Sequence, residues 1–101
     1  MTDRELLEGA AKAAGIEGEY RTENLCVGGD WMDVTAIFFP DGMGWWNSLQ
    51  EDGDALRLAV QLDLLFDLEA SRLHSEELAA GAEPNEAARR AFTRAAAAML
   101  A

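Results

Sequence analysis

The fold class is decided by residues 24–40, which read NLCVGGDWMDVTAIFFP. β-branched and aromatic residues flank a Gly28-Gly29-Asp30 sequence, a combination typical of two antiparallel strands joined by a tight turn. We therefore predict a hairpin with strands at roughly 21–27 and 34–39. Its neighbours along the chain show a different periodicity.

Apolar residues recur at helical spacing on both sides of this hairpin. At the N-terminus, Thr2 and Glu5 have the spacing of a capping box, and Gly15 suits a left-handed cap after a helix. The last helix is expected to open at Pro84, a favoured first helical position. Its predicted inner stripe consists of Ala88, Ala91, Phe92, Ala95 and Met99.

A further helix is expected to begin within residues 50–54. Ser48 and Glu51 again have capping-box spacing, and the acids within residues 51–54 suit the positive end of the helix dipole. Polar residues recur along one side of this segment. The face predicted to contact the core therefore consists of Leu56, Ala59, Val60 and Leu62.

Residues 64–72 satisfy two patterns at once. Each residue favours a helix individually, yet Phe66, Leu68 and Ala70 alternate with polar residues, and this alternation favours a strand. Residues 74–84 are then expected to form a connection, with room for one helical turn. The chain as a whole, residues 1–101, is predicted to be a single α+β domain. Three helices would pack on a small antiparallel sheet of three to four strands, in the order α-β-β-α-β-α.

Acidic residues dominate the charge of the chain. It contains 19 acids and 8 bases, a net charge of −11, and only two of the bases, Arg21 and Arg57, lie within residues 17–69. Direct binding to nucleic acid is excluded, because that requires Lys and Arg on the phosphates. The charge favours a partner with a basic surface, although a merely well-solvated acidic exterior is an open alternative.

Neither a membrane location nor a cofactor is expected. No segment approaches the roughly 18 apolar residues of a membrane span, and the acidic N-terminus is unlike a signal peptide, so we expect a soluble intracellular protein. The glycine pairs lack the pattern and the lysine of a nucleotide-binding loop. The single cysteine, Cys26, makes no disulfide and no ligand pair, and we expect it to be a small buried strand residue.

No catalytic or metal site is predicted. The only histidine, His74, stands in a polar segment with no serine or cysteine nucleophile at a suggestive spacing. A small hydrolase that uses paired carboxylates is the weakest alternative. The Glu51-Asp52-Gly53-Asp54 sequence is similar to a calcium loop, but that loop needs a bidentate Glu where this chain has Ala59.

The tryptophans are the predicted anchors for a partner. Trp45 and Trp46, in a short strand, would face opposite sides, so only one of them can lie fully in the core. Exposed Trp is a favoured interface residue, although both indoles could instead cover the open end of the sheet. On the last helix, Arg90 and Arg94 are expected to pair with acids from residues 17–69. The predicted partner-binding residues are Trp31, Asp33, Asp41, Trp45, Trp46, Glu51, Asp52 and Asp54.

Three stretches resemble a known family in the same order. They are TDRELLEGAAKAAGI at the N-terminus, WNSLQEDGDALRLAVQLDL in the middle and EAARRAFTRAAAAML near the C-terminus. They are similar to small, mostly uncharacterised proteins of tailed bacteriophages and prophages, whereas residues 17–39 match poorly. The resemblance supplies no catalytic residues. It implies a phage accessory protein that acts in the cytoplasm of the bacterial host.

The resemblance and the charge together suggest a function. A small acidic phage protein of the anti-CRISPR or another anti-defence type would be a non-enzymatic inhibitor, whose acidic face occupies the basic nucleic-acid channel of a host protein or nucleoprotein complex. The alternative is a phage accessory or assembly protein that forms homodimers or binds another phage protein.

Overall fold

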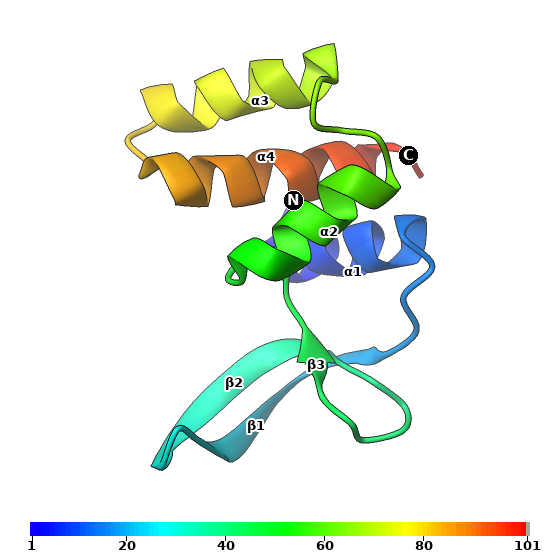
Figure 1. Cartoon of the computed structure of the whole chain (residues 1–101), viewed down its shortest axis with the longest axis vertical. Coiled ribbons are helices and arrows are strands. Elements are labelled where there is room, and N and C mark those ends of the chain that lie inside the picture. The colour runs from blue at the N-terminus through cyan, green and yellow to red at the C-terminus, as the bar shows by residue number, and fades with distance from the viewer. Residues whose placement is uncertain (101) are drawn as a thin grey trace.

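The predicted α+β class is confirmed, with one helix more than expected. The computed structural model describes residues 1–100, and within them the chain forms four helices and three strands (Figure 1). Their bounds are α1 Asp3–Ala13, β1 Glu19–Val27, β2 Asp30–Phe38, β3 Trp45–Trp46, α2 Asp52–Gln61, α3 Leu68–Ala79 and α4 Pro84–Ala98. The strands form an antiparallel sheet in the order β1-β2-β3.

The hairpin of β1 and β2 is longer than the sequence predicted. Its strands pair without interruption from Glu19 opposite Phe38 to Val27 opposite Asp30. Gly28 and Gly29 form the turn with φ angles of 62° and 90°. Positive φ at both central residues is what a type I′ turn requires, and glycine adopts it without strain. Two consecutive glycines are therefore enough to fix the register of the whole hairpin.

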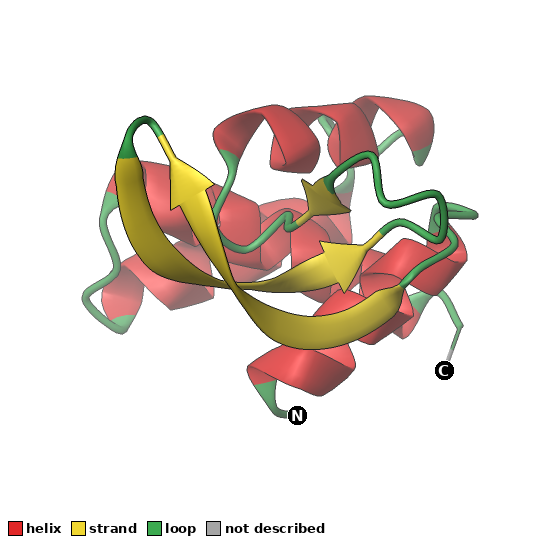
Figure 2. Ribbon diagram, turned by 90° about the horizontal axis from the view of Figure 1, so that it is seen from below, coloured by secondary structure: helices red, strands yellow, loops and turns green. Residues whose placement is uncertain are grey.

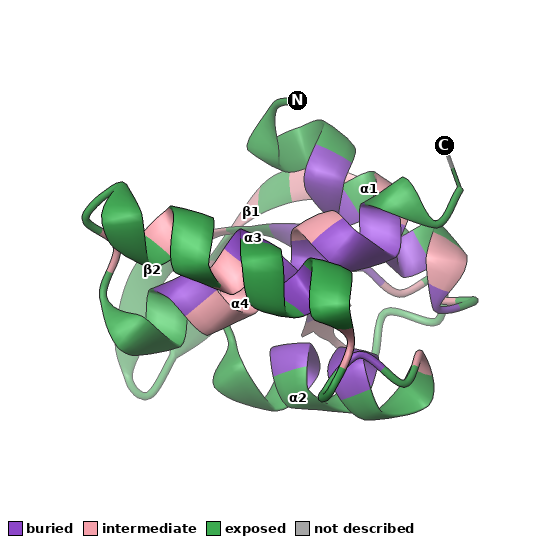
Figure 3. Ribbon diagram, turned by 90° about the horizontal axis from the view of Figure 1, so that it is seen from above, coloured by how far each residue is buried: buried purple, intermediate pink, exposed green. Residues whose placement is uncertain are grey.

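The helices and the hairpin occupy opposite ends of the molecule. Helix α4 packs against α1, α2 and α3, so the four helices form one body, while the hairpin extends away from it (Figures 1 and 2). Figure 3 shows buried residues concentrated between the helices and exposed residues along the far hairpin. Small side chains allow close helix packing. A Cβ on Gly9 of α1 would lie 3.0 Å from the Cβ of Ala97 in α4.

Residues 68–79 form helix α3, so the predicted strand is wrong. Asp67 caps this helix by accepting a hydrogen bond from the Ala70 amide at 3.0 Å. The alternating apolar residues do not share a buried face, because Phe66 is 95% exposed and Leu68 is 88% exposed. Only Ala70 and Leu73, at helical spacing, are buried. The segment predicted as a connection from residue 74 is therefore largely the second half of α3.

Helix α2 forms where it was predicted but is rotated about its axis. Ala55, Leu58 and Ala59 face the core, whereas Leu56 and Val60 are exposed. The rotation corresponds to about one residue, or 100°. Asp54 explains it, since this carboxylate is turned inward and accepts a hydrogen bond from the Asn47 amide at 2.9 Å.

The two predicted capping boxes have different outcomes. At α1, Thr2 and Glu5 make both bonds of the motif, and Gly15 has the expected positive φ of 72°. At α2, Glu51 is the cap residue but its side chain makes no capping bond. The Ser48 hydroxyl is instead buried 2.8 Å from the Thr93 hydroxyl of α4. The predicted second capping box is therefore wrong, because Ser48 packs against α4 and does not cap α2.

Two smaller expectations also need correction. Cys26 is exposed, because the far half of the hairpin has no helix over it. On α4, Ala91 and Ala95 are buried as expected, but Met99 is exposed and Thr93 is buried. Among the described residues, the helices are all too short or too polar to cross a bilayer.

Candidate binding surface: the acidic sheet side and its groove

Charge is distributed unevenly between the two ends of the molecule. Residues 22–56, which include most of the hairpin, β3 and the start of α2, contain no Lys or Arg. All seven arginines form ion pairs, and five of them lie on α2, α3 and α4. Unpaired acids occur at both ends of the described molecule, but the sheet end has no Lys or Arg of its own to offset them. The acids of residues 22–56 are Glu23, Asp30, Asp33, Asp41, Glu51, Asp52 and Asp54.

The arginines of α4 are neutralised by neighbouring helices. Arg90 pairs with Asp3 of α1 at 3.1 Å, and both Arg90 and Arg94 pair with Glu77 of α3. Arg94 also hydrogen-bonds Glu76, which lowers the pKa of that carboxyl. Neutralisation within the chain was expected, but the acids that supply it lie outside residues 17–69. These pairs hold α1 and α3 against α4 and leave those arginines unavailable to a partner.

Four predicted or neighbouring acids remain without a cation, and we call this set the acidic sheet side: Asp30, Asp33, Asp41 and Glu51. None of the four forms an ion pair within residues 1–100. Asp33 accepts a hydrogen bond from the Asn24 amide group at 3.0 Å, and Asp41 accepts one from the Met43 backbone amide at 2.8 Å. Their charges are therefore exposed and uncompensated.

Three predicted partner-binding residues make contacts within the fold. Trp46 is 4% exposed and belongs to the core. Asp54 is buried and engaged by Asn47 and Arg57, while Asp52 pairs with Arg89 of α4 at 2.6 Å. The Asp-Gly-Asp sequence thus connects the start of α2 to Asn47 and to Arg89 of α4. Within residues 1–100, no cluster of three or more Cys, His, Asp or Glu side chains is arranged around a common centre that could hold a metal ion.

Apolar side chains are exposed toward the tip of the hairpin. Trp31 is 72% exposed, and Met32 and Val27 are also exposed. At the base of the sheet, Trp45 is half-buried and packs on Phe38 with ring centroids 5.9 Å apart. The expected opposition of Trp45 and Trp46 is confirmed. Trp31 is therefore the most accessible of the predicted anchors.

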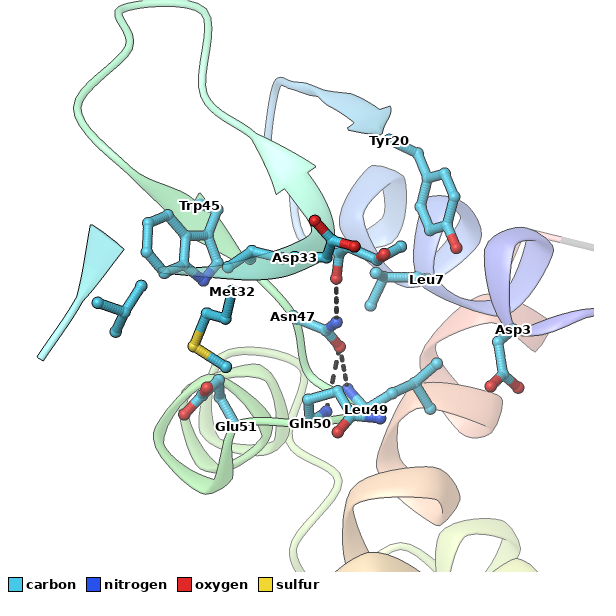
Figure 4. A pocket seen from close by; sticks show the side chains of 13 residues that line it. Asp3, Leu7, Tyr20, Met32, Asp33, Trp45, Asn47, Leu49, Gln50 and Glu51 are labelled. Atoms are coloured by element: carbon cyan, nitrogen blue, oxygen red, sulfur yellow. Dashed lines mark hydrogen bonds between the residues drawn. The ribbon is translucent and has the colours of Figure 1, made fainter. Parts of the chain in front are cut away.

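A groove of about 540 Å³ lies against β2 and extends from Trp45 and Glu51 to Tyr20 of β1 and to Asp3 and Leu7 of α1. We call it the edge groove, and Figure 4 shows its walls: Met32, Asp33 and Trp45 on the sheet, and Gln50 and Glu51 at the start of α2. Three acids line it, and no Lys, Arg or His does. The hollow thus joins apolar surface to negative charge.

Asn47 lines this groove between β2 and the segment before α2, and the sequence prediction missed it. Its amide nitrogen donates to the Thr35 carbonyl at 2.9 Å, and its side-chain oxygen accepts from the Leu49 and Gln50 amides at 2.9 and 3.1 Å (Figure 4). Bonds from an Asn side chain to amides two and three residues ahead are typical of a turn. The Asn47-Ser48 pair directly after β3 was the sequence feature from which this turn could have been predicted.

His74 and its neighbours form no recognisable catalytic arrangement. The histidine lies half-buried in α3 beside Ser71, in a small cavity of about 150 Å³ that Leu64, Ala91 and Phe92 also line. No hydrogen bond joins His74 to Ser71 within the described residues. The surroundings of this histidine are those of a helix interface.

Comparisons with known proteins add no family. No family model, no curated protein and no solved structure matches this chain. The resemblance to phage proteins is thus a prediction from the three quoted stretches, and function has to be argued from the surface described above.

Proposed function

We propose that this chain is a non-enzymatic binding protein that occupies a basic surface of a protein or nucleoprotein partner. The observation that carries the proposal is the acidic sheet side, whose four carboxylates have no cation within residues 1–100. Ion pairs elsewhere neutralise the arginines of α4, and residues 22–56 contain no Lys or Arg, so the sheet end keeps a net negative charge. Such a surface accelerates encounter with a positive partner and repels nucleic acid.

The hairpin adds exposed apolar side chains to the charged surface. It extends clear of the helices and carries Trp31 and Met32 exposed beside Asp30 and Asp33. An aromatic anchor surrounded by charge is a common arrangement in protein interfaces. Binding would leave the helical body unchanged, because none of these side chains belongs to the core.

A narrower proposal concerns the biological setting. The resemblance to phage proteins supports an inhibitor of a bacterial defence complex, of the anti-CRISPR type, that acts in the host cytoplasm. The acidic sheet side would then compete with nucleic acid for a basic channel. Within this proposal Trp31, Asp33, Trp45 and Glu51 make the contacts, with Asp41 at the margin, and no cofactor takes part.

Affinity capture from a bacterial lysate tests the proposal, with and without nuclease. The unaltered protein should retain a basic, nucleic-acid-binding complex after nuclease treatment, and the triple variant Asp30→Asn, Asp33→Asn, Glu51→Gln should lose it. The matched control is Asp63→Asn, Glu83→Gln, Glu86→Gln, which removes three carboxylates without ion pairs from the helical end and should keep the partner. Equal retention by both variants would refute the proposal.

A second candidate rests on the exposed apolar residues of the hairpin. Val27, Trp31 and Met32 could instead join two copies of the chain, as expected of an accessory or assembly protein. Size-exclusion chromatography with light scattering separates the two. A monomer fits the first proposal, whereas a dimer that dissociates on Trp31→Ser would favour the second.

A further inference from the structure

The outer edge of β2 presents unpaired backbone groups. The Thr35 carbonyl accepts from Asn47, on the side of β2 away from β1. Ile37, two residues on, pairs with Trp46 on that same side. Since backbone groups alternate in direction along a strand, those of Asp33 and Trp31 point the same way. Strand β3 covers only Ile37 and Phe38, so the amides and carbonyls of Trp31 and Asp33 have no strand beside them.

Side-chain pairs across the hairpin support this alternation. The Thr22 and Thr35 hydroxyls lie 2.7 Å apart, and Asn24 bonds Asp33 at 3.0 Å. Such close side-chain pairs are expected at positions whose backbone groups do not bond each other across the ladder. The backbone groups of Thr35 and Asp33 therefore face away from β1.

The edge groove lies beside this open edge. Met32, Val34 and Trp45 supply an apolar wall, and Asp33 and Glu51 supply charge that no cation neutralises within residues 1–100. The Asn47 side chain bonds the Thr35 carbonyl, where a longer β3 would otherwise pair. Beside β2, from Thr35 to Trp31, a further strand could therefore pair, because β3 is too short to reach this part of the edge.

We infer that an extended basic segment of the partner adds to the sheet beside β2, bonding the backbone of Trp31 and Asp33, with Lys or Arg near Asp33 and Glu51 and apolar side chains on Met32 and Trp45. This inference rests on the proposed function and names the form that its partner takes. Main-chain bonds supply affinity in such strand addition, and side-chain pockets supply specificity.

Charge favours a foreign basic segment over a second copy of this chain. A symmetric pairing of two β2 edges centred on Asp33 would place two carboxylates opposite each other, and like charges there are destabilising. Each copy also carries a net charge of −11. A segment rich in Lys or Arg relieves the repulsion that a second copy would add.

Selection from a displayed library of random heptapeptides on the immobilised protein, at low salt, identifies a probe. We expect the enriched peptides to alternate Lys or Arg with apolar, β-branched residues. The most enriched one is then synthesised with blocked termini, and its binding is measured by titration. Absence of enrichment, or enrichment of peptides without basic residues, overturns the inference.

Two changes then separate main-chain bonding from charge. The variant Asp33→Pro removes the outward amide, and proline is tolerated on an edge strand because that amide does not serve the ladder. It should weaken the probe at least about tenfold, whereas Asp33→Asn, which keeps the amide, should weaken it only about threefold and reduce its salt dependence. Equal losses in the two variants overturn strand addition.

A probe methylated on alternate backbone nitrogens gives the same test without altering the protein. Methylation on the edge-facing nitrogens should abolish binding, and methylation on the other set should not. If both methylated probes bind like the parent, strand addition is wrong. The lysate comparison of the two triple variants is an independent readout, so that result would leave the proposed function standing, while equal retention in the lysate would refute the proposed function by itself.

Discussion

The helical body and the hairpin use their residues in opposite ways. In the body, every described arginine of α2, α3 and α4 is paired and the core is built, as Arg94 with Glu77 and the buried Leu58 illustrate. In the far hairpin, Asp30 and Asp33 lack cations and Trp31 is exposed to solvent. The core thus lies in one region and the proposed contact surface in the other, so we expect substitutions to alter stability or binding without altering both.

The largest expected effect comes from the core of the body. Leu58→Ala removes a side chain that is 1% exposed and should lower the free energy of unfolding by about 2–5 kcal/mol. Leu25→Ala, its counterpart on the half-buried hairpin, should cost less than about 1 kcal/mol. Urea denaturation of both variants measures the contrast. Similar losses would show that the hairpin contributes to the same core.

A buried hydroxyl pair should give the next effect. Thr93 donates to the Arg89 carbonyl at 2.7 Å, so Ser48 must donate to Thr93. Thr93→Val leaves the buried Ser48 without an acceptor and should cost about 1–3 kcal/mol. The double variant with Ser48→Ala removes both partners and should recover part of that loss. Thermal unfolding measures the stability of the two variants. If the double variant is no more stable than Thr93→Val, the loss comes from packing volume and not from the unpaired hydroxyl.

The turn of the hairpin should respond locally. Gly29→Ala places a side chain at a φ of 90° and should cost about 1 kcal/mol. The control is Gly53→Ala inside α2, where the new Cβ would meet only the flexible end of Arg57 and should stabilise the helix. Amide hydrogen exchange should show faster exchange in β1 and β2 for the first variant while the helices stay protected. Faster exchange throughout would contradict the separation of the two regions.

The smallest effect is the response of the helical ion pairs to acid. Arg72 lowers the pKa of Glu69, and Arg94 lowers that of Glu76. A lowered pKa in the folded state adds stability that is complete above the ordinary value of about 4.3 and is lost as the pH falls through the lowered value. Stability should therefore decline below about pH 4, and the Glu69→Gln, Glu76→Gln variant should show a shallower decline in urea midpoints. An unchanged slope would mean that these exposed pairs contribute nothing.

Local chemistry made part of the fold predictable. The two glycines of the turn and the Thr2–Glu5 capping box act through neighbours a few residues away, and both formed as expected. The strand predicted at residues 64–72 was wrong. The alternation of Phe66, Leu68 and Ala70 looks like a buried strand face, but two of those side chains are exposed. Sequence cannot reveal which apolar residues stay outside the core.

Long-range contacts explain the errors in the candidate site. Trp46 and Asp54 look like surface anchors, but Trp46 joins a core cluster with residues of α1 and α4, and Asp54 is turned inward to the Asn47 amide. The pairing of Asp52 with Arg89 spans 37 positions and leaves no local pattern. The accessible part of the prediction, Trp31 and Asp33, lies where the chain makes only hairpin contacts. Both are exposed, although the strand that carries them was predicted to begin only at residue 34.

The exposed cysteine of the hairpin has a practical consequence. Cys26 is the only thiol in the chain and lies opposite Trp31 in the sheet. A maleimide dye or nitroxide would therefore attach at one position, next to the proposed contact surface, without any engineered residue. The molecule carries its own reporter site, through which the arrival of a ligand could be followed spectroscopically in real time.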